Sequence, residues 1–241
     1  TFKEGLKRIL ANLNYYFVTA AHVLEVMNNN KAFYYYNRVL YETANLPAYT
    51  SDVSSWESRN DDPIDLGIIP LPTSIISTMD KADFISYEQY KEGDDHPSAF
   101  YQALGYPHAK NTKLIRKTFN KPGEFLAEGI RYTVDEISDT ALPHKNLNKM
   151  THIATTLTKT GKSQGSRTTK DIPDLHGISG GILQKVSNYN HDTDGFDIAF
   201  PAGIILEKNA NNTALYSLRL EFVFKWIDIH ESMFNSFQKC N

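Results

Sequence analysis

The chain has 241 residues, 41% of them hydrophobic, and its 25 basic and 28 acidic side chains give a net charge of −3. This composition is typical of a globular domain with a sizeable core and excludes an intrinsically disordered chain. The slight acidic excess does not support nucleic-acid binding, which usually needs a basic surface. No apolar run reaches the roughly 18 residues of a transmembrane helix, so no membrane partner is expected.

Short apolar runs separated by turn residues recur along the chain and predict a mostly β structure. Before them, apolar residues between Phe2 and Leu13 repeat at helical spacing. The charged segment 80–95 is expected to connect two halves with a helical turn, and the polar segment 158–170 is expected to be a loop. The predicted strands are residues 15–18, 33–40, 66–71, 99–104, 125–134, 152–157, 181–186 and 198–206.

A C-terminal amphipathic helix is predicted over residues 222–237. Apolar side chains recur there at intervals of three and four residues, which places them on one helical face. That face consists of Phe222, Trp226, Ile229, Met233 and Phe237.

Three short motifs supply the parts of a nucleophilic site. The sequence TAAH follows an apolar run and ends at His22, and Asp65 directly precedes a second apolar run. Ser179 lies in the sequence GISGG, where glycines allow a sharp turn. A histidine, an aspartate and a serine in this order are what acyl transfer by a hydroxyl nucleophile requires.

The predicted chemistry divides among these residues. His22 accepts the proton of the Ser179 hydroxyl, and Asp65 orients the imidazole and stabilises its charged form. The backbone amides of Gly177 and Ser179 form an oxyanion hole. Taken singly, each motif also fits a plain strand end or a tight turn without catalytic function. Asp61 and Asp62 are alternatives to Asp65 as the acid that orients His22.

These motifs resemble those of the trypsin-like (chymotrypsin-fold) serine peptidases, which carry TAAH, an aspartate before a strand, and GxSGG in the same order. Residues 202–206 are similar to that family's strand after the serine, and the sequence GYP at 105–107 resembles a turn of bacterial members. The resemblance implies an all-β fold of two packed six-stranded Greek-key β-barrels with a C-terminal α-helix. Residues 1–85 would form the first barrel and residues 95–241 the second.

Two departures from that family bear on function. Ile178 precedes the serine where secreted members carry an aspartate that pairs with a new N-terminal amine, so we expect no such activation and expect packing of Ile178 to hold the turn. Cys240 is the single cysteine, so no disulfide can form within the chain. This favours a reducing compartment, and we expect the bacterial cytoplasm, with the periplasm as the alternative.

The resemblance also locates a substrate pocket. An apolar Pro173 stands where members with basic specificity carry an aspartate, while Asp174 and Glu207 could attract a basic P1 residue. A small or apolar P1 residue is the alternative, and His176 is expected in an exposed loop at the rim. The predicted substrate-binding residues are Pro173, Asp174, His176, Gly203, Leu206 and Glu207.

The expected function is therefore that of a bacterial intracellular serine endopeptidase that performs limited, regulated proteolysis, in which a regulatory partner or fused sensor domain controls access. Its partner is a protein or peptide substrate, and no cofactor or metal is expected. The alternatives are a protease-fold binding module without catalysis and a viral processing peptidase. An acidic segment at 192–197 resembles a calcium loop but lacks the later glutamate, so a hairpin turn is expected there.

Overall fold

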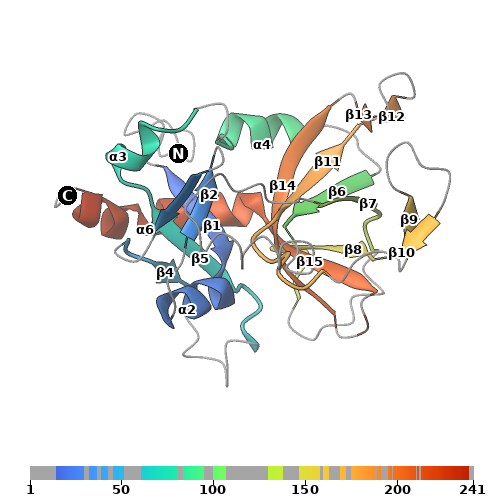
Figure 1. The fold of residues 1–241 in the computed structure, drawn as a ribbon, viewed down its shortest axis with the longest axis horizontal. Coiled ribbons are helices and arrows are strands. Elements are labelled where there is room, and N and C mark those ends of the chain that lie inside the picture. The colour runs from blue at the N-terminus through green and yellow to red at the C-terminus, as the bar shows by residue number, and fades with distance from the viewer. Residues whose placement is uncertain are drawn as a thin grey trace.

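The structure is a computed structural model. It describes residues 15–29, 33–36, 39–42, 46–51, 61–80, 84–94, 100–106, 130–137, 147–157, 160–162, 169–171, 175–187, 189–190, 195–196, 198–209, 211 and 213–238. Two antiparallel sheets lie side by side and a long helix ends the chain, as Figure 1 shows. The prediction of a mostly β structure with a C-terminal helix is confirmed.

The first sheet has the strand order β1-β5-β4. Its central strand β5 (Leu66–Pro70) is buried along its whole length, as expected for a continuous apolar run. It pairs antiparallel with β1 (Tyr16–Ala20) and with the short β4 (Tyr49–Thr50). The end of β1 and the start of β5 meet, which brings residues 20 and 66 opposite each other.

The second sheet has six antiparallel strands and curls so far that its two edges meet. Beyond one edge strand, Glu136 forms a bridge with Thr155 of the other, and the Ile137 amide donates to the Ala154 carbonyl at 2.8 Å. The strands in spatial order are β7 (Ile130–Val134), β6 (Phe100–Gly105), β11 (Ile182–Val186), β14 (Ala199–Lys208), β15 (Ala214–Arg219) and β8 (His152–Thr156).

Three two-stranded hairpins complete the described β structure. The first, β2 (Phe33–Tyr36) with β3 (Val39–Glu42), replaces the single strand predicted over 33–40. The second hairpin lies where a loop was predicted over 158–170. The third hairpin lies where a hairpin turn was predicted at 192–197. These two hairpins are β9 (Thr160–Lys162) with β10 (Thr169–Asp171), and β12 (Tyr189–Asn190) with β13 (Gly195–Phe196).

The remaining strand predictions match described strands within a few residues, but β4 and β15 were not predicted. Residues 125–129 of one predicted strand lie outside the described residues, as does the helical pattern between Phe2 and Leu13.

The four described helices are α2 (Ala21–Asn29), α3 (Thr73–Ile76), α4 (Tyr87–Asp94) and α6 (Leu220–Gln238). Within the described part of the chain, none of them is long and apolar enough to cross a membrane.

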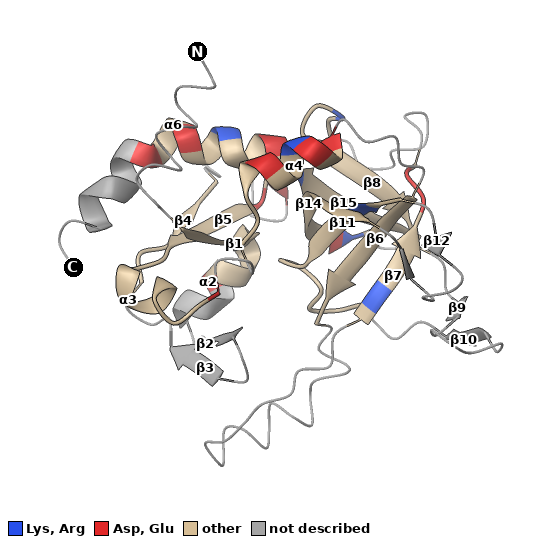
Figure 2. Cartoon of the chain, turned by 90° about the horizontal axis from the view of Figure 1, so that it is seen from above, with Lys and Arg blue, Asp and Glu red and all other residues tan. Residues whose placement is uncertain are grey.

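Helices α4 and α6 lie along one side of both sheets and carry much of the acidic charge, as Figure 2 shows. The buried face of α6 agrees with the predicted one only in part. Phe222 and Trp226 of the predicted face pack against the shared core, and the side chains of Met233 and Phe237 lie outside the described ones. Val223 and Ile227 are buried, whereas Ile229 is 74% exposed. The sequence is apolar at six of the eight positions from 222 to 229, so two adjacent faces fit the helical spacing and only packing selects one.

A shared hydrophobic core joins the two sheets. One cluster of buried side chains combines Ala20, Leu66 and Ile68 of the first sheet with Ile204 and Leu218 of the second. Helix α6 adds to the same cluster, and a separate cluster fills the interior of the second sheet. This shared packing fixes the position of the first sheet relative to the second.

Candidate active site

His22 lies in the first turn of α2, directly after strand β1. The first amides of a helix have no partner within the helix. Here Asp65 satisfies two of them: its carbonyl accepts from the Ala21 amide at 2.6 Å, and its Oδ1 accepts from the His22 amide at 2.9 Å. A carboxylate at this helix end is also favoured by the helix dipole.

The second carboxylate oxygen of Asp65 binds the imidazole. His22 Nδ1 lies 2.6 Å from Asp65 Oδ2, and because a carboxylate only accepts, Nδ1 carries the proton in this pair. The Asp65 side chain is 11% exposed and that of His22 is 40% exposed. The acid is therefore held inside while the imidazole remains reachable, which leaves Nε2 as a proton acceptor.

The electrostatic surroundings of His22 favour its charged form. The hydrogen bond with Asp65 is the largest cause, and it raises the pKa of His22 above 6.5, although burial acts in the opposite direction. The negative charges of Asp65, Glu207 and Glu25 raise this pKa further. An imidazole in this setting accepts a proton more readily than a free histidine does.

Ser179 lies in a tight turn that leads into β11. The Ile178 amide donates to the Leu175 carbonyl and the Gly181 amide to the Ile178 carbonyl, each at 2.9 Å. Gly177 and Gly180 have φ of 86° and 83°, in the left-handed region that glycine adopts without strain. Ile178 is 2% exposed and packs in the interior of the second sheet, in accord with the expectation that its packing holds the turn.

Two backbone amides in this turn have no hydrogen-bond acceptor among the residues that the structure describes. The Gly180 amide donates to the Ile205 carbonyl of β14 at 2.7 Å, and the flanking amides of residues 178 and 181 are bonded within the turn. Within the described residues, the amides of Gly177 and Ser179 donate to no acceptor. These are the two amides predicted to form an oxyanion hole, and nothing described competes for them.

The turn packs against the strand that leads to His22. A Cβ atom added at Gly180 would overlap Thr19 Oγ1, so the two segments lie in direct contact. Among the described side chains, no hydrogen bond joins the Ser179 hydroxyl to His22. The structure therefore brings His22 and Asp65 together and packs the Ser179 turn against Thr19, three residues before His22, without a hydrogen bond between Ser179 and His22 among the described residues.

The predicted substrate-binding residues fall in different surroundings. His176 is exposed next to Gly177, and Glu207 is exposed on β14. Gly203 is buried between neighbouring strands, and Leu206 is 3% exposed in the shared core. Pro173 and Asp174 lie outside the described residues, so the assignment of this set to substrate binding stays a prediction.

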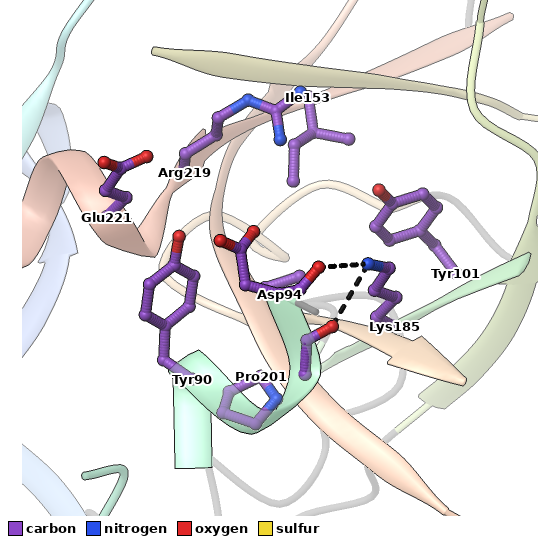
Figure 3. Close-up of a pocket in the computed structure, with 10 residues that line it drawn as sticks. Tyr90, Asp94, Tyr101, Ile153, Lys185, Pro201, Arg219 and Glu221 are labelled. Atoms are coloured by element: carbon purple, nitrogen blue, oxygen red, sulfur yellow. Dashed lines mark hydrogen bonds between the residues drawn. The ribbon is translucent and has the colours of Figure 1, made fainter. Parts of the chain in front are cut away.

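A small polar pocket lies apart from the predicted site, between α4, α6 and the second sheet. Its volume is about 60 Å³. Figure 3 shows Asp94 and Glu221 on its wall beside the cations Arg219 and Lys185, and the Lys185 ammonium donates to the Gly93 and Asp94 carbonyls. No predicted site residue lines this pocket. Within the described residues, no group of histidine, cysteine and carboxylate side chains is arranged to hold a metal ion.

Two residues that support the turn carrying Asp65, Ser51 and His152, were not predicted from the sequence, and Asp62 was predicted only as a competitor of Asp65. Ser51 and Asp62 hydrogen-bond each other there, and His152 reaches the Pro63 carbonyl from the second sheet. Neither Ser51 nor His152 lies in a recognisable motif, and only contacts across the fold reveal their role.

A scan against protein-family models found no family that matches the chain, and a search of curated proteins found no matching relative.

Proposed function

We propose that the protein is a serine endopeptidase that hydrolyses peptide bonds through an acyl-enzyme on Ser179. The observation that carries the proposal is the His22–Asp65 pair, together with a turn packed against Thr19 in which two amides donate to no acceptor among the described residues. A nucleophile, a base, an orienting acid and an oxyanion site are the groups that such a reaction needs.

The reaction follows from the positions of these groups. The Ser179 oxygen attacks the substrate carbonyl while its proton passes to His22 Nε2, and Asp65 stabilises the resulting imidazolium. The amides of Gly177 and Ser179 donate to the oxyanion, each worth about 3–4 kcal/mol in the transition state. His22 then gives the proton to the leaving amine. In the second step a water molecule passes a proton to His22 and attacks the acyl group, and His22 returns that proton to the Ser179 oxygen as the ester bond breaks.

The arrangement of the second sheet supports a trypsin-like fold. Strands β11, β14 and β15 follow one another in the sheet, and the earlier strand β8 lies beside the last of them. Three consecutive strands and a fourth that returns beside the far one form a Greek key. With the contact between the two edges of the sheet, this order supports our proposal that residues 95–241 form a six-stranded Greek-key barrel.

The substrate is proposed to be a protein or peptide that lies between the two sheets. Glu207 is exposed and close enough to raise the pKa of His22, so a basic substrate residue would be attracted to this side of the site. We infer limited cleavage of specific partners, under the control of a regulatory protein or domain, in a bacterial cell. A protease-fold module that binds without cleaving is the second candidate, because the described structure contains no serine–histidine hydrogen bond.

Hydrolysis of a proteome-derived peptide library tests the proposal. The wild-type protein is expected to cleave a subset of peptides at a defined residue, and Ser179→Ala is expected to abolish cleavage while it still binds them. Cleavage that persists in Ser179→Ala would contradict the proposal. Binding without cleavage by the wild-type protein would favour the non-catalytic module.

A further inference from the structure

The turn that carries Asp65 has an unfavourable backbone conformation that needs support. Asp65 has φ of 40°, in the left-handed region that costs a non-glycine residue energy. Asp62 accepts from the Ile64 amide at 3.0 Å and from the Ser51 hydroxyl at 2.5 Å. Ser51 Oγ in turn accepts from the Leu66 amide at 3.0 Å. These contacts hold both ends of the turn, and all of them come from the first part of the chain.

One contact to this turn comes from the other sheet. His152 of β8 is 3% exposed, and its Nε2 lies 2.5 Å from the Pro63 carbonyl oxygen. Because a carbonyl only accepts, Nε2 carries the proton and donates it. Nδ1 accepts from the Asn148 amide at 3.3 Å. It also lies 2.8 Å from Thr151 Oγ1, whose hydroxyl donates to the Asn148 carbonyl, and 3.2 Å from that carbonyl oxygen. Burial lowers the pKa of His152 below 6.5, in agreement with a neutral ring that donates on one side and accepts on the other.

We propose that His152 is a positioning residue for Asp65, which ties the turn that carries this carboxylate to the sheet that carries Ser179. Pro63 is two residues before Asp65, and the Ser179 turn leads into β11 of the same sheet as His152. A directional hydrogen bond fixes the turn more closely than apolar packing alone does. The catalytic consequence rests on the proposed function, whereas the effect on the His22–Asp65 pair does not.

The first test measures the pKa of His22 by NMR in variants of residue 152. His152→Phe keeps an aromatic ring but removes the donor, so the Asp65 turn is expected to loosen and the pKa of His22 to fall toward 6.5. His152→Gln places an amide donor near the former Nε2 and is expected to restore most of the shift. A folded His152→Phe variant in which His22 titrates as in the wild type would overturn the proposal.

Thr155→Val is the matched control. Thr155 lies on the same strand, is fully buried, and donates to the Leu215 carbonyl within the second sheet. Its replacement removes a buried side-chain-to-backbone hydrogen bond, longer at 3.5 Å, without touching the Asp65 turn. The pKa of His22 is expected to stay at the wild-type value in this variant, and a fall equal to that of His152→Phe would show that the effect is general destabilisation.

A measurement on the wild-type protein keeps the proposal testable if His152→Phe does not fold. Imidazole ¹⁵N chemical shifts distinguish the two neutral tautomers. At neutral pH, His152 is expected to carry its proton on Nε2, with slow exchange with solvent. A proton on Nδ1 would leave no donor for the Pro63 carbonyl and would overturn the proposal.

Kinetics separate failure of this inference from failure of the proposed function. If the wild type cleaves peptides, His152→Phe is expected to lower kcat by about a hundredfold with KM unchanged, because the catalytic groups are misplaced while the substrate contacts remain. An unchanged kcat would overturn the positioning role and leave the peptidase proposal intact. If the wild type cleaves nothing, the His22 titration still decides whether His152 positions Asp65.

Discussion

At the scale of single residues, Asp65 has two roles: it caps helix α2 and it binds the imidazole of His22. Its Oδ1 and backbone carbonyl cap the first amides of α2, and its Oδ2 holds the imidazole of His22. The position of the base and its protonation therefore depend on the same carboxylate. Removal of the charge with retention of the side-chain shape tests this dependence directly.

Asp65→Asn is expected to lower kcat by about four orders of magnitude, because an amide does not stabilise the imidazolium and permits the wrong tautomer. The pH profile carries a second expectation. His22 must be neutral to accept a proton, and its pKa is raised, so wild-type kcat/KM is expected to fall as pH drops through a value above 6.5. In Asp65→Asn this acidic limb is expected to move to lower pH. A limb that stays in place would show that Asp65 does not set the basicity of His22.

The residues of the candidate pair could be predicted because local sequence carries their signal. An apolar strand before His22 and another after Asp65 are visible without a structure, and His22 hydrogen-bonds Asp65 while its competitor Asp62 binds Ser51. His152 could not be predicted, since its partner Pro63 is 89 residues away and neither residue belongs to a motif.

At the scale of elements, the turn before β11 has room for glycine alone at position 180. Gly180→Ala is expected to lower the free energy of unfolding by about 2 kcal/mol or more, because an alanine is strained at φ of 83° and its methyl would overlap Thr19 Oγ1. Chemical denaturation measures the loss. Addition of Thr19→Ala is expected to recover part of it, since the overlap is relieved and the backbone strain remains. A Gly180→Ala variant as stable as the wild type would contradict this packing.

Helix α6 offers a matched pair of isoleucines two positions apart. Ile227 is 5% exposed in the shared core, and Ile229 is 74% exposed. Ile227→Ala is expected to lower the free energy of unfolding by about 2–4 kcal/mol, and Ile229→Ala by less than about 0.5 kcal/mol. Equal losses in the two variants would contradict the observed orientation of the helix.

The type of most elements could be predicted, but their partners could not. The missed strand β15 mixes small, polar and apolar side chains without clear alternation. It is nevertheless buried, since Leu215 packs in the interior of the second sheet and Leu218 in the shared core. The segment 33–40 was predicted as one strand although Asn37 and Arg38 interrupt its apolar residues, because no glycine or proline separates its two halves. In both cases the pairing with other strands determines the structure, and the β-propensity of the residues does not predict that pairing.

At the scale of the whole molecule, the shared core couples the two sheets. Ile204 of the second sheet and Ile68 of the first lie in one buried cluster. We therefore expect one cooperative unfolding transition, in which the NMR signals of His22 and His152 disappear at the same denaturant concentration. Ile204→Ala is expected to lower both midpoints equally. Separate midpoints for the two histidines would show that the sheets fold independently.

The central claim is that the His22–Asp65 pair activates the Ser179 hydroxyl, and covalent labelling tests it most directly. A fluorophosphonate reacts with an activated serine, and mass spectrometry of the digested protein locates the adduct. The account predicts an adduct on Ser179 in the wild type, a much slower reaction in Asp65→Asn and none in His22→Ala. A folded wild-type protein that stays unlabelled at Ser179, or that reacts equally fast without His22, would contradict it.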